Sequence, residues 1–169
     1  MDNKDWIDFL MYTSILRVFL RAFPIVYIVF IWLQSSYFNP ETVAGLSDTL
    51  NKAVVLIIGV SLEFAHLFEF GLLYLFIFLA FLSFGKIGKW QNRLAITVAL
   101  LYSLVDEIHQ IYVPFRSFSL DDLLKDAIGI FFIWWLIRNN YFTKKDSRFG
   151  ELLRKVAQLP NKDKNEVSL

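Results

Sequence analysis

The chain has 169 residues, of which 56% are hydrophobic, 18% aromatic and 20% charged, and its mean hydropathy is +0.48. This composition excludes an ordinary soluble enzyme, because a single domain of this length has no core large enough for so many apolar side chains. The 17 basic and 16 acidic residues give a net charge of +1, which disfavours a nucleic-acid partner, and the lack of cysteine excludes disulfides, thiolate metal sites and a thiol nucleophile.

The first of four apolar runs covers residues 15–33. Its charged side chains, Arg17 and Arg21, lie near its start, where long basic side chains can reach a membrane interface. The preceding residues 1–14 are rich in aspartate, and no small-residue cleavage site follows the run. We therefore expect a retained membrane anchor that is preceded by a cytoplasmic or interfacial N-terminus.

The second apolar run, residues 53–84, has no basic residue. It is longer than the roughly 20 residues that cross a bilayer as a helix. Because glycine weakens a helix, we divide the run near Gly59. The prediction is a short interfacial helix over about 47–60, followed by a membrane span over about 63–84.

The third run, residues 94–113, is stopped by Pro114. The fourth, residues 123–137, becomes long enough to span a bilayer when its acidic first turn, which begins at Leu120, is included. The remaining residues 138–169 are polar and basic. We predict a partly disordered cytoplasmic tail there, with an amphipathic turn or two.

The charges of the loops orient these runs by the positive-inside rule. Basic residues gather between the second and third runs and after the fourth: Lys86, Lys89, Arg93, Arg138, Lys144, Lys145, Arg148, Arg154 and Lys155. The other two loops have few basic residues, and four spans with both termini inside satisfy every loop. The sequence therefore predicts an all-α membrane protein, a bundle of four transmembrane helices over residues 15–137 with cytoplasmic N and C termini.

Ionisable side chains inside apolar spans are costly, so they mark functional sites by default. The predicted topology places three groups of them at the outer ends of the second, third and fourth spans, with Asp106 and Asp126 about 10 Å below the surface. The polar residues of these groups are Glu63, His66, Glu69, Asp106, Glu107, His109, Gln110, Arg116, Asp121, Asp122, Lys125 and Asp126. We expect them to form one outward-facing polar pocket.

Seven of these side chains are acidic and outnumber the basic ones nearby. Pairing within the group therefore leaves carboxylates that must be protonated, hydrated, or bound to a cation or a cationic substrate group. For each single residue, and most of all for His109, the alternative stays open that the polar groups satisfy one another and only fix the helix packing.

A spaced run of polar residues from the third span to the fourth resembles the signature of the VanZ-like family of bacterial membrane proteins. Its members are Glu107, Gln110, Tyr112, Pro114, Arg116, Ser119, Asp122, Asp126 and Gly129. Upstream, the segment His66-Leu67-Phe68-Glu69-Phe70 looks like the family's H-F-x-E-Y segment. The chain has Glu63 where the family commonly has lysine, and Asp126 where it has asparagine, so its pocket is more acidic.

The resemblance covers roughly residues 63–137 and implies a small multi-pass protein of the bacterial cytoplasmic membrane. The family takes its name from a member associated with resistance to the glycopeptide antibiotic teicoplanin. The resemblance does not supply a reaction, so the chemistry has to be inferred from the residues.

We assign candidate roles within the predicted pocket. The candidate catalytic residues are Glu107, His66, Asp122 and Asp126, and the candidate substrate-binding residues are Arg116, Gln110, Glu69, Asp106, Tyr112 and Ser119. Arg116 could hold a phosphate or carboxylate, and His66 with Glu69 could form an oriented base. The carboxylates could act as acid/base groups or as oxygen ligands for a divalent cation. No serine or cysteine nucleophile is indicated.

Three functions stay open. The first is an enzyme or binding protein whose partner is a membrane lipid or a lipid-linked cell-wall precursor. The second is a non-catalytic protein that binds such a precursor or the glycopeptide itself, whose amines would complement an acidic pocket. The third is a cation-coupled transporter, which the apolar inner halves of the spans disfavour.

Overall fold

The computed structural model describes residues 3–37, 39, 45, 51–144 and 146–166, with side chains left out at 3–10, 52, 62, 63, 66 and 160–166. These residues form helices, turns and loops, and they contain no strand. The helices are, in chain order, α1 (Asn3–Tyr37), α3 (Lys52–Leu82), α4 (Lys89–Gln110), α5 (Leu120–Ile137), a π-helical segment η2 (Arg138–Thr143) and α6 (Arg148–Glu166). The all-α prediction is confirmed.

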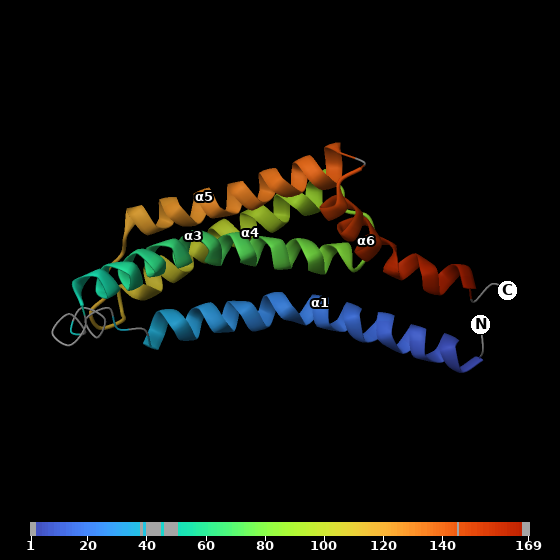
Figure 1. Ribbon diagram of the computed structural model, residues 1–169, viewed down its shortest axis with the longest axis horizontal. Coiled ribbons are helices and arrows are strands. Elements are labelled where there is room, and N and C mark those ends of the chain that lie inside the picture. Colours follow the sequence, from blue (N-terminus) through green and yellow to red (C-terminus); the bar gives the residue numbers. More distant parts are fainter. Residues whose placement is uncertain (1–2, 38, 40–44, 46–50, 145, 167–169) are drawn as a thin grey trace.

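Helices α3, α4 and α5 pack side by side, and α1 runs along one side of them (Figure 1). Between the helices lies an apolar core. It is built from Phe70, Leu73, Tyr74, Phe78 and Leu82 of α3, Ala95 and Ala99 of α4, and Ile130 and Ile137 of α5. Helix α1 begins at the end of the molecule at which α6 ends.

The outermost helix, α1, exposes most of its apolar side chains. Its segment Met11–Tyr37 contains an 18-residue window with a mean hydropathy of 2.0, of which 11% is buried, and the segment is long and apolar enough to cross a membrane. Leu67–Leu82 of α3 is a shorter apolar stretch. Near its middle, α1 is fixed to the end of α3 by Arg21, which donates hydrogen bonds to the hydroxyl and carbonyl oxygens of Ser83, each at 3.0 Å.

Among the described residues, the segment in α1 is thus the one predicted span whose length and composition suffice to cross a membrane. Helices α4 and α5 are shorter, and they carry charged side chains at their ends, which lowers their mean hydropathy. The four-span bundle therefore stays a prediction.

Helices α3 and α5 cross at two glycines, Gly71 and Gly129. A Cβ atom at Gly71 would lie 2.9 Å from the carbonyl oxygen of Gly129, and one at Gly129 would overlap the carbonyl oxygen of Leu67. Small residues at such crossings let two helix backbones approach closely, as in other membrane helices. This close approach packs the middle of α5 against α3.

The predicted interfacial helix over 47–60 is wrong as a separate element. Helix α3 runs without interruption from Lys52 to Leu82 and passes through Gly59. One glycine in a helix costs about 1 kcal/mol relative to alanine, and no proline follows to end the helix. Residues 46–50, where the predicted helix would begin, lie outside the described residues.

Within the predicted tail, Arg148–Glu166 form the helix α6, which contains the expected amphipathic turns. This helix buries Leu153 and Ala157 against the bundle. Its Gly150 lies so close to η2 that a Cβ atom there would overlap the carbonyl oxygen of Asn140. On its exposed face Lys155 donates to Glu151 at 3.0 Å, and this contact lowers the pKa of Glu151. Residues 167–169 lie outside the described part of the tail.

Candidate functional site

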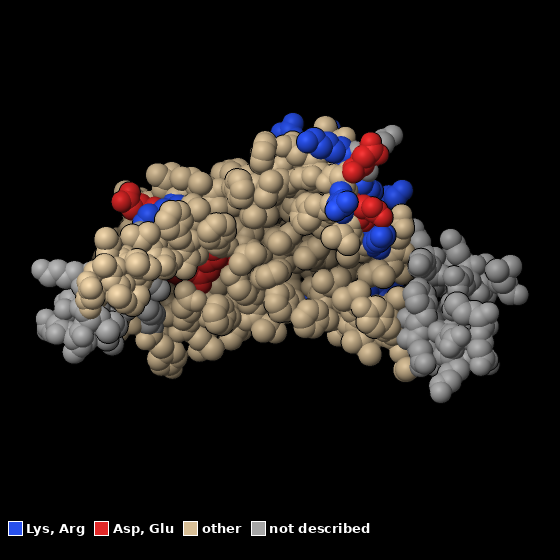
Figure 2. Space-filling view, in the orientation of Figure 1, with Lys and Arg blue, Asp and Glu red and all other residues tan. Residues whose placement is uncertain are grey.

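Buried acidic side chains gather near the end of the bundle at which α4 ends and α5 begins. They are Glu69 of α3, Asp106 and Glu107 of α4, and Asp126 of α5, and we call them the carboxylate cluster. Asp126 lies within electrostatic range of the other three. In Figure 2, charged side chains lie toward the two ends of the bundle, and an acidic patch is recessed in an otherwise uncharged surface.

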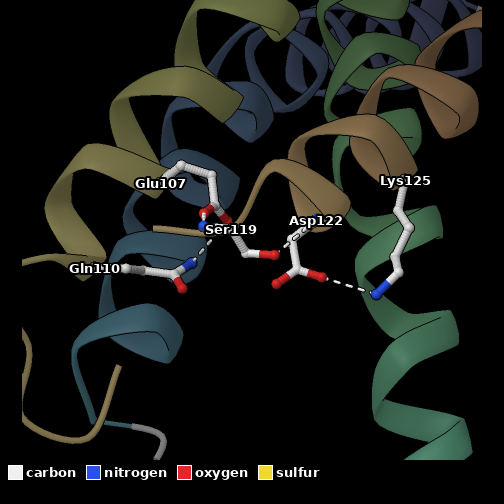
Figure 3. A network of polar contacts seen from close by, with 5 residues as sticks. All are labelled: Glu107, Gln110, Ser119, Asp122 and Lys125. Atoms are coloured by element: carbon white, nitrogen blue, oxygen red, sulfur yellow. Dashed lines mark hydrogen bonds and ion pairs between the residues drawn. The ribbon is translucent and has the colours of Figure 1, made fainter. Parts of the chain in front are cut away.

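Glu107 is held in place by the loop that precedes α5 (Figure 3). It is 1% exposed, and its Oε2 accepts a hydrogen bond from the backbone N–H of Ser119 at 2.8 Å. The Nε2 of Gln110 donates to Oε1 of Glu107 at 3.4 Å and to Oδ2 of Asp106 at 2.9 Å. Gln110 therefore joins the two adjacent carboxylates of α4.

Ser119 also begins α5. Its hydroxyl oxygen accepts a hydrogen bond from the backbone N–H of Asp122 at 3.1 Å, which is the usual arrangement of a helix N-cap. The carboxylate of Asp122 pairs with Lys125 at 2.8 Å and is only half-buried. In Figure 3, the Asp122 side chain points toward Lys125 rather than toward Glu107. Asp122 thus lies at the edge of the carboxylate cluster.

Asp106 and Asp126 are each buried with one carboxylate oxygen bonded and the other free. The hydroxyl of Ser103 donates a hydrogen bond to Oδ2 of Asp126 at 2.9 Å, and Nε2 of Gln110 donates one to Oδ2 of Asp106. The Oδ1 atom of each aspartate is buried and has no hydrogen-bond partner in the described structure. Buried polar atoms are nearly always hydrogen-bonded in proteins, so these two oxygens indicate a place for a ligand or a proton.

Glu69 connects the cluster to a groove of about 240 Å³ between α1 and α3. Apolar and aromatic side chains line most of this groove, among them Phe30, Phe68 and Leu72. Gln34 of α1 donates to Oε2 of Glu69 at 3.5 Å, and Tyr27 donates to the Glu69 backbone carbonyl at 3.2 Å. The groove therefore joins an apolar surface to a buried carboxylate.

The other predicted site residues lie around the cluster or on the surface. Arg116 is half-buried in the loop before α5, and its positive charge acts on both Glu69 and Glu107. Tyr112 is 81% exposed in the turn after α4, away from the buried carboxylates. His66 is in α3, one turn before Glu69, but its side chain lies outside the described part of the structure.

Two residues of the site were not predicted. Ser103 bonds Asp126, and its position on α4, one turn before Asp106, is the sequence signal that could have identified it. Gln34, at the end of the first apolar run, gives no comparable signal because its partner is on another helix.

His109 stacks on Trp32, with 3.8 Å between the ring centroids, and its Nε2 lies 2.9 Å from the Ser36 hydroxyl. These contacts link α4 to α1, which fits a packing role for this histidine.

The described residues offer no ready-made metal centre. Within the described side chains, no group of three or more histidine, aspartate or glutamate residues is arranged to hold a metal ion. The side chains of Glu63 and His66 lie outside this described part. What the cluster does offer is several hydrogen-bond acceptors and titratable oxygens in a confined space.

The match with known proteins covers the helices that build this site. The family model VanZ/LLP1 matches residues 13–142, which is more than three quarters of the chain and extends from α1 to η2. Comparisons with curated proteins and with solved structures gave no match. The predicted resemblance is confirmed, and the chain belongs to the VanZ/LLP1 family.

Proposed function

We propose that this member of the VanZ/LLP1 family is a multi-pass protein of the bacterial cytoplasmic membrane. In this proposal α1, α3, α4 and α5 are the four spans, and both termini are cytoplasmic. The 22 residues of α4 give a length of about 33 Å, close to the roughly 30 Å of a bilayer's hydrocarbon core. The apolar side chains exposed along α1 and α5, such as Ile25, Val29 and Phe132, would then contact lipid.

With this orientation the carboxylate cluster faces the outer leaflet, and its partner is the headgroup of a membrane lipid or of a lipid-linked cell-wall precursor. The observation that carries this proposal is the position of Glu69, which borders both the apolar groove and the cluster. A hydrocarbon chain lying in the groove along Phe30, Phe68 and Leu72 would bring its polar end to Glu69. Ligand sites commonly combine such an apolar wall with a few fixed polar groups.

The chemistry that best fits the cluster is proton transfer. Asp106 and Asp126 each have a buried, unbonded oxygen, and neighbouring carboxyl groups in a confined site share protons. Glu107 is fixed by two donors, which suits a group that orients a hydroxyl or amine of the substrate. Arg116 is placed to bind a phosphate or a carboxylate of the same headgroup.

The test compares Glu107→Gln with Asp121→Asn. Glu107 is buried in the cluster, whereas Asp121 is an exposed acid of the same polar end, so both variants remove one carboxylate. Purified protein in nanodiscs made from the host's polar lipids and lipid-linked precursor is assayed by mass spectrometry for new products. We expect Glu107→Gln to lower turnover about 100-fold or more, because acid/base groups contribute at least that much, and Asp121→Asn to retain it. Full turnover in folded Glu107→Gln protein would refute the catalytic proposal.

A second candidate function is binding without a reaction. It is favoured by the excess of carboxylates over cations in the cluster, which would attract the amines of a glycopeptide such as teicoplanin. In that case the nanodiscs form no product, but they bind teicoplanin, and Glu107→Gln weakens this binding. Teicoplanin tolerance of cells that express each variant shows whether either activity operates in vivo. If the wild-type protein neither turns over lipid nor binds the antibiotic, both candidates fail.

A further inference from the structure

A second pocket lies at the opposite end of the bundle, between the beginning of α4 and the end of α5. It has a volume of about 370 Å³, within the range of about 300–1,000 Å³ of small-ligand sites. Lys89 and Arg93 of α4 and Arg138 of η2 lie along it. Along α4, Lys89 is about 25 Å from Asp106 at 1.5 Å per residue, so this pocket is separate from the carboxylate cluster.

The pocket presents hydrogen-bond donors and positive charge. No acidic side chain is among the described residues that line it, and none of the described carboxylates forms an ion pair with Lys89, Arg93 or Arg138. Asn92 also lines the pocket, and its Oδ1 accepts a hydrogen bond from the buried hydroxyl of Tyr74 at 2.8 Å. That bond leaves the amide Nδ2 of Asn92 as a donor. The pocket thus combines three cations and a neutral donor, and the first turn of α4 adds a partial positive charge.

The other wall of the pocket is apolar. Ile96, Trp134 and Phe142 form it, and the guanidinium of Arg138 lies 5.2 Å from the Trp134 ring. Tryptophan is enriched at the level of lipid headgroups, and basic pockets between membrane helices on the cytoplasmic side bind anionic headgroups. A ligand for this pocket therefore needs an anionic end and an apolar end.

We propose that this pocket binds the phosphate group of an anionic phospholipid through Lys89, Arg93, Arg138 and the amide of Asn92, with the glycerol and upper chains against Trp134. An isolated phosphate ion shares the anionic chemistry but would leave the apolar wall unused. The assignment to a lipid rests on the membrane orientation proposed above. It does not rest on the function proposed for the carboxylate cluster, because the two sites lie at opposite ends of α4 and α5.

The test measures ligand binding to the full chain in a neutral detergent by native mass spectrometry. The probes are short-chain phosphatidylglycerol, short-chain phosphatidylcholine and inorganic phosphate, each added separately. We expect phosphatidylglycerol to bind most tightly and binding to weaken with added salt. The double variant Arg93→Gln/Arg138→Gln should bind phosphatidylglycerol about tenfold more weakly or worse, because it loses two charged donors. The matched control Arg148→Gln/Lys155→Gln removes two charges from α6 and should bind like wild type.

A second variant distinguishes a loss of binding from a loss of folding. Asn92→Asp keeps an acceptor oxygen for Tyr74 but places a negative charge in the pocket, so it should abolish binding without changing the thermal unfolding midpoint by more than a few degrees. Equal binding by the double variant and its control would overturn the site. If inorganic phosphate binds as tightly as phosphatidylglycerol, the phosphate site stands and its assignment to a lipid is overturned.

Discussion

The close crossing of α3 and α5 makes a quantitative prediction for Gly129→Ala. The added methyl group would overlap the carbonyl oxygen of Leu67 and lie 2.9 Å from its carbonyl carbon. Both atoms belong to the backbone of α3, so the two helices must move apart for the methyl group to fit. Overpacking of this kind costs about 1–3 kcal/mol, and we expect the upper end of the range because no side chain can give way.

Alanine also favours the helix itself, by about 1 kcal/mol relative to glycine. The net loss of stability expected for Gly129→Ala is therefore about 2 kcal/mol. Gly71→Ala is expected to cost less, from about zero to 1 kcal/mol net. Its closest contacts are the Gly129 carbonyl oxygen at 2.9 Å and the Ile133 side chain at 3.1 Å, and the second of these can adjust.

The free energy of unfolding is measured by denaturant titration of the purified protein, with tryptophan fluorescence as the signal. The control is Leu124→Ala, since Leu124 lies on α5 with 60% of its surface exposed and should change stability by only about 0.5 kcal/mol. The specific result expected is that Gly129→Ala loses more stability than either Gly71→Ala or the control. If Gly129→Ala unfolds at the same denaturant concentration as wild type, α3 and α5 do not approach as closely as described.

Two further predictions concern the start of α5 and the topology. Ser119→Ala should lower the free energy of unfolding by about 1 kcal/mol through loss of the helix cap, and Ser119→Asp should restore most of it, as measured by the same titration. Because the chain has no cysteine, single cysteines can be labelled without background. In intact cells, Asp121→Cys should react with a membrane-impermeant maleimide and Glu151→Cys should not until the cells are lysed. Labelling of both, or of Glu151→Cys alone, would contradict both termini being cytoplasmic.

The helices that the sequence predicted well are those with a clear apolar run and a chemical stop. Pro114 ends the third run and the acidic turn from Leu120 begins the fourth. Helix α4 ends and helix α5 begins near these residues. The division of α3 at Gly59 failed because one unfavourable residue cannot interrupt a helix that is apolar on both sides of it. The length of α6 was underestimated, because a polar, amphipathic segment gains much of its helix stability from burying side chains such as Leu153 and Ala157 against other elements.

The sequence predicted which residues belong to the carboxylate cluster better than it predicted the contacts that they make. The spacing of polar residues placed Glu69, Asp106, Glu107 and Asp126 at one depth, and the structure brings these four together. The direction in which a side chain at a given depth points depends on which helices are neighbours. The sequence does not give these neighbours directly. For this reason the exposed position of Tyr112 could be found only from the structure.

The charges of α4 run against the helix's own dipole. Lys89 and Arg93 lie in its first turns, where positive charge is unfavourable, and Asp106 and Glu107 lie near its end, where negative charge is unfavourable. Each such placement near a helix end costs about 0.3–1 kcal/mol. Helix α5 shows the opposite pattern, with an acidic first turn and Arg138 at its end, so its charges stabilise it. Helix stability therefore explains the charges of α5 but not those of α4. The α4 charges fit a role in orienting the protein in the membrane and in the two proposed sites, one at each end of the same helix.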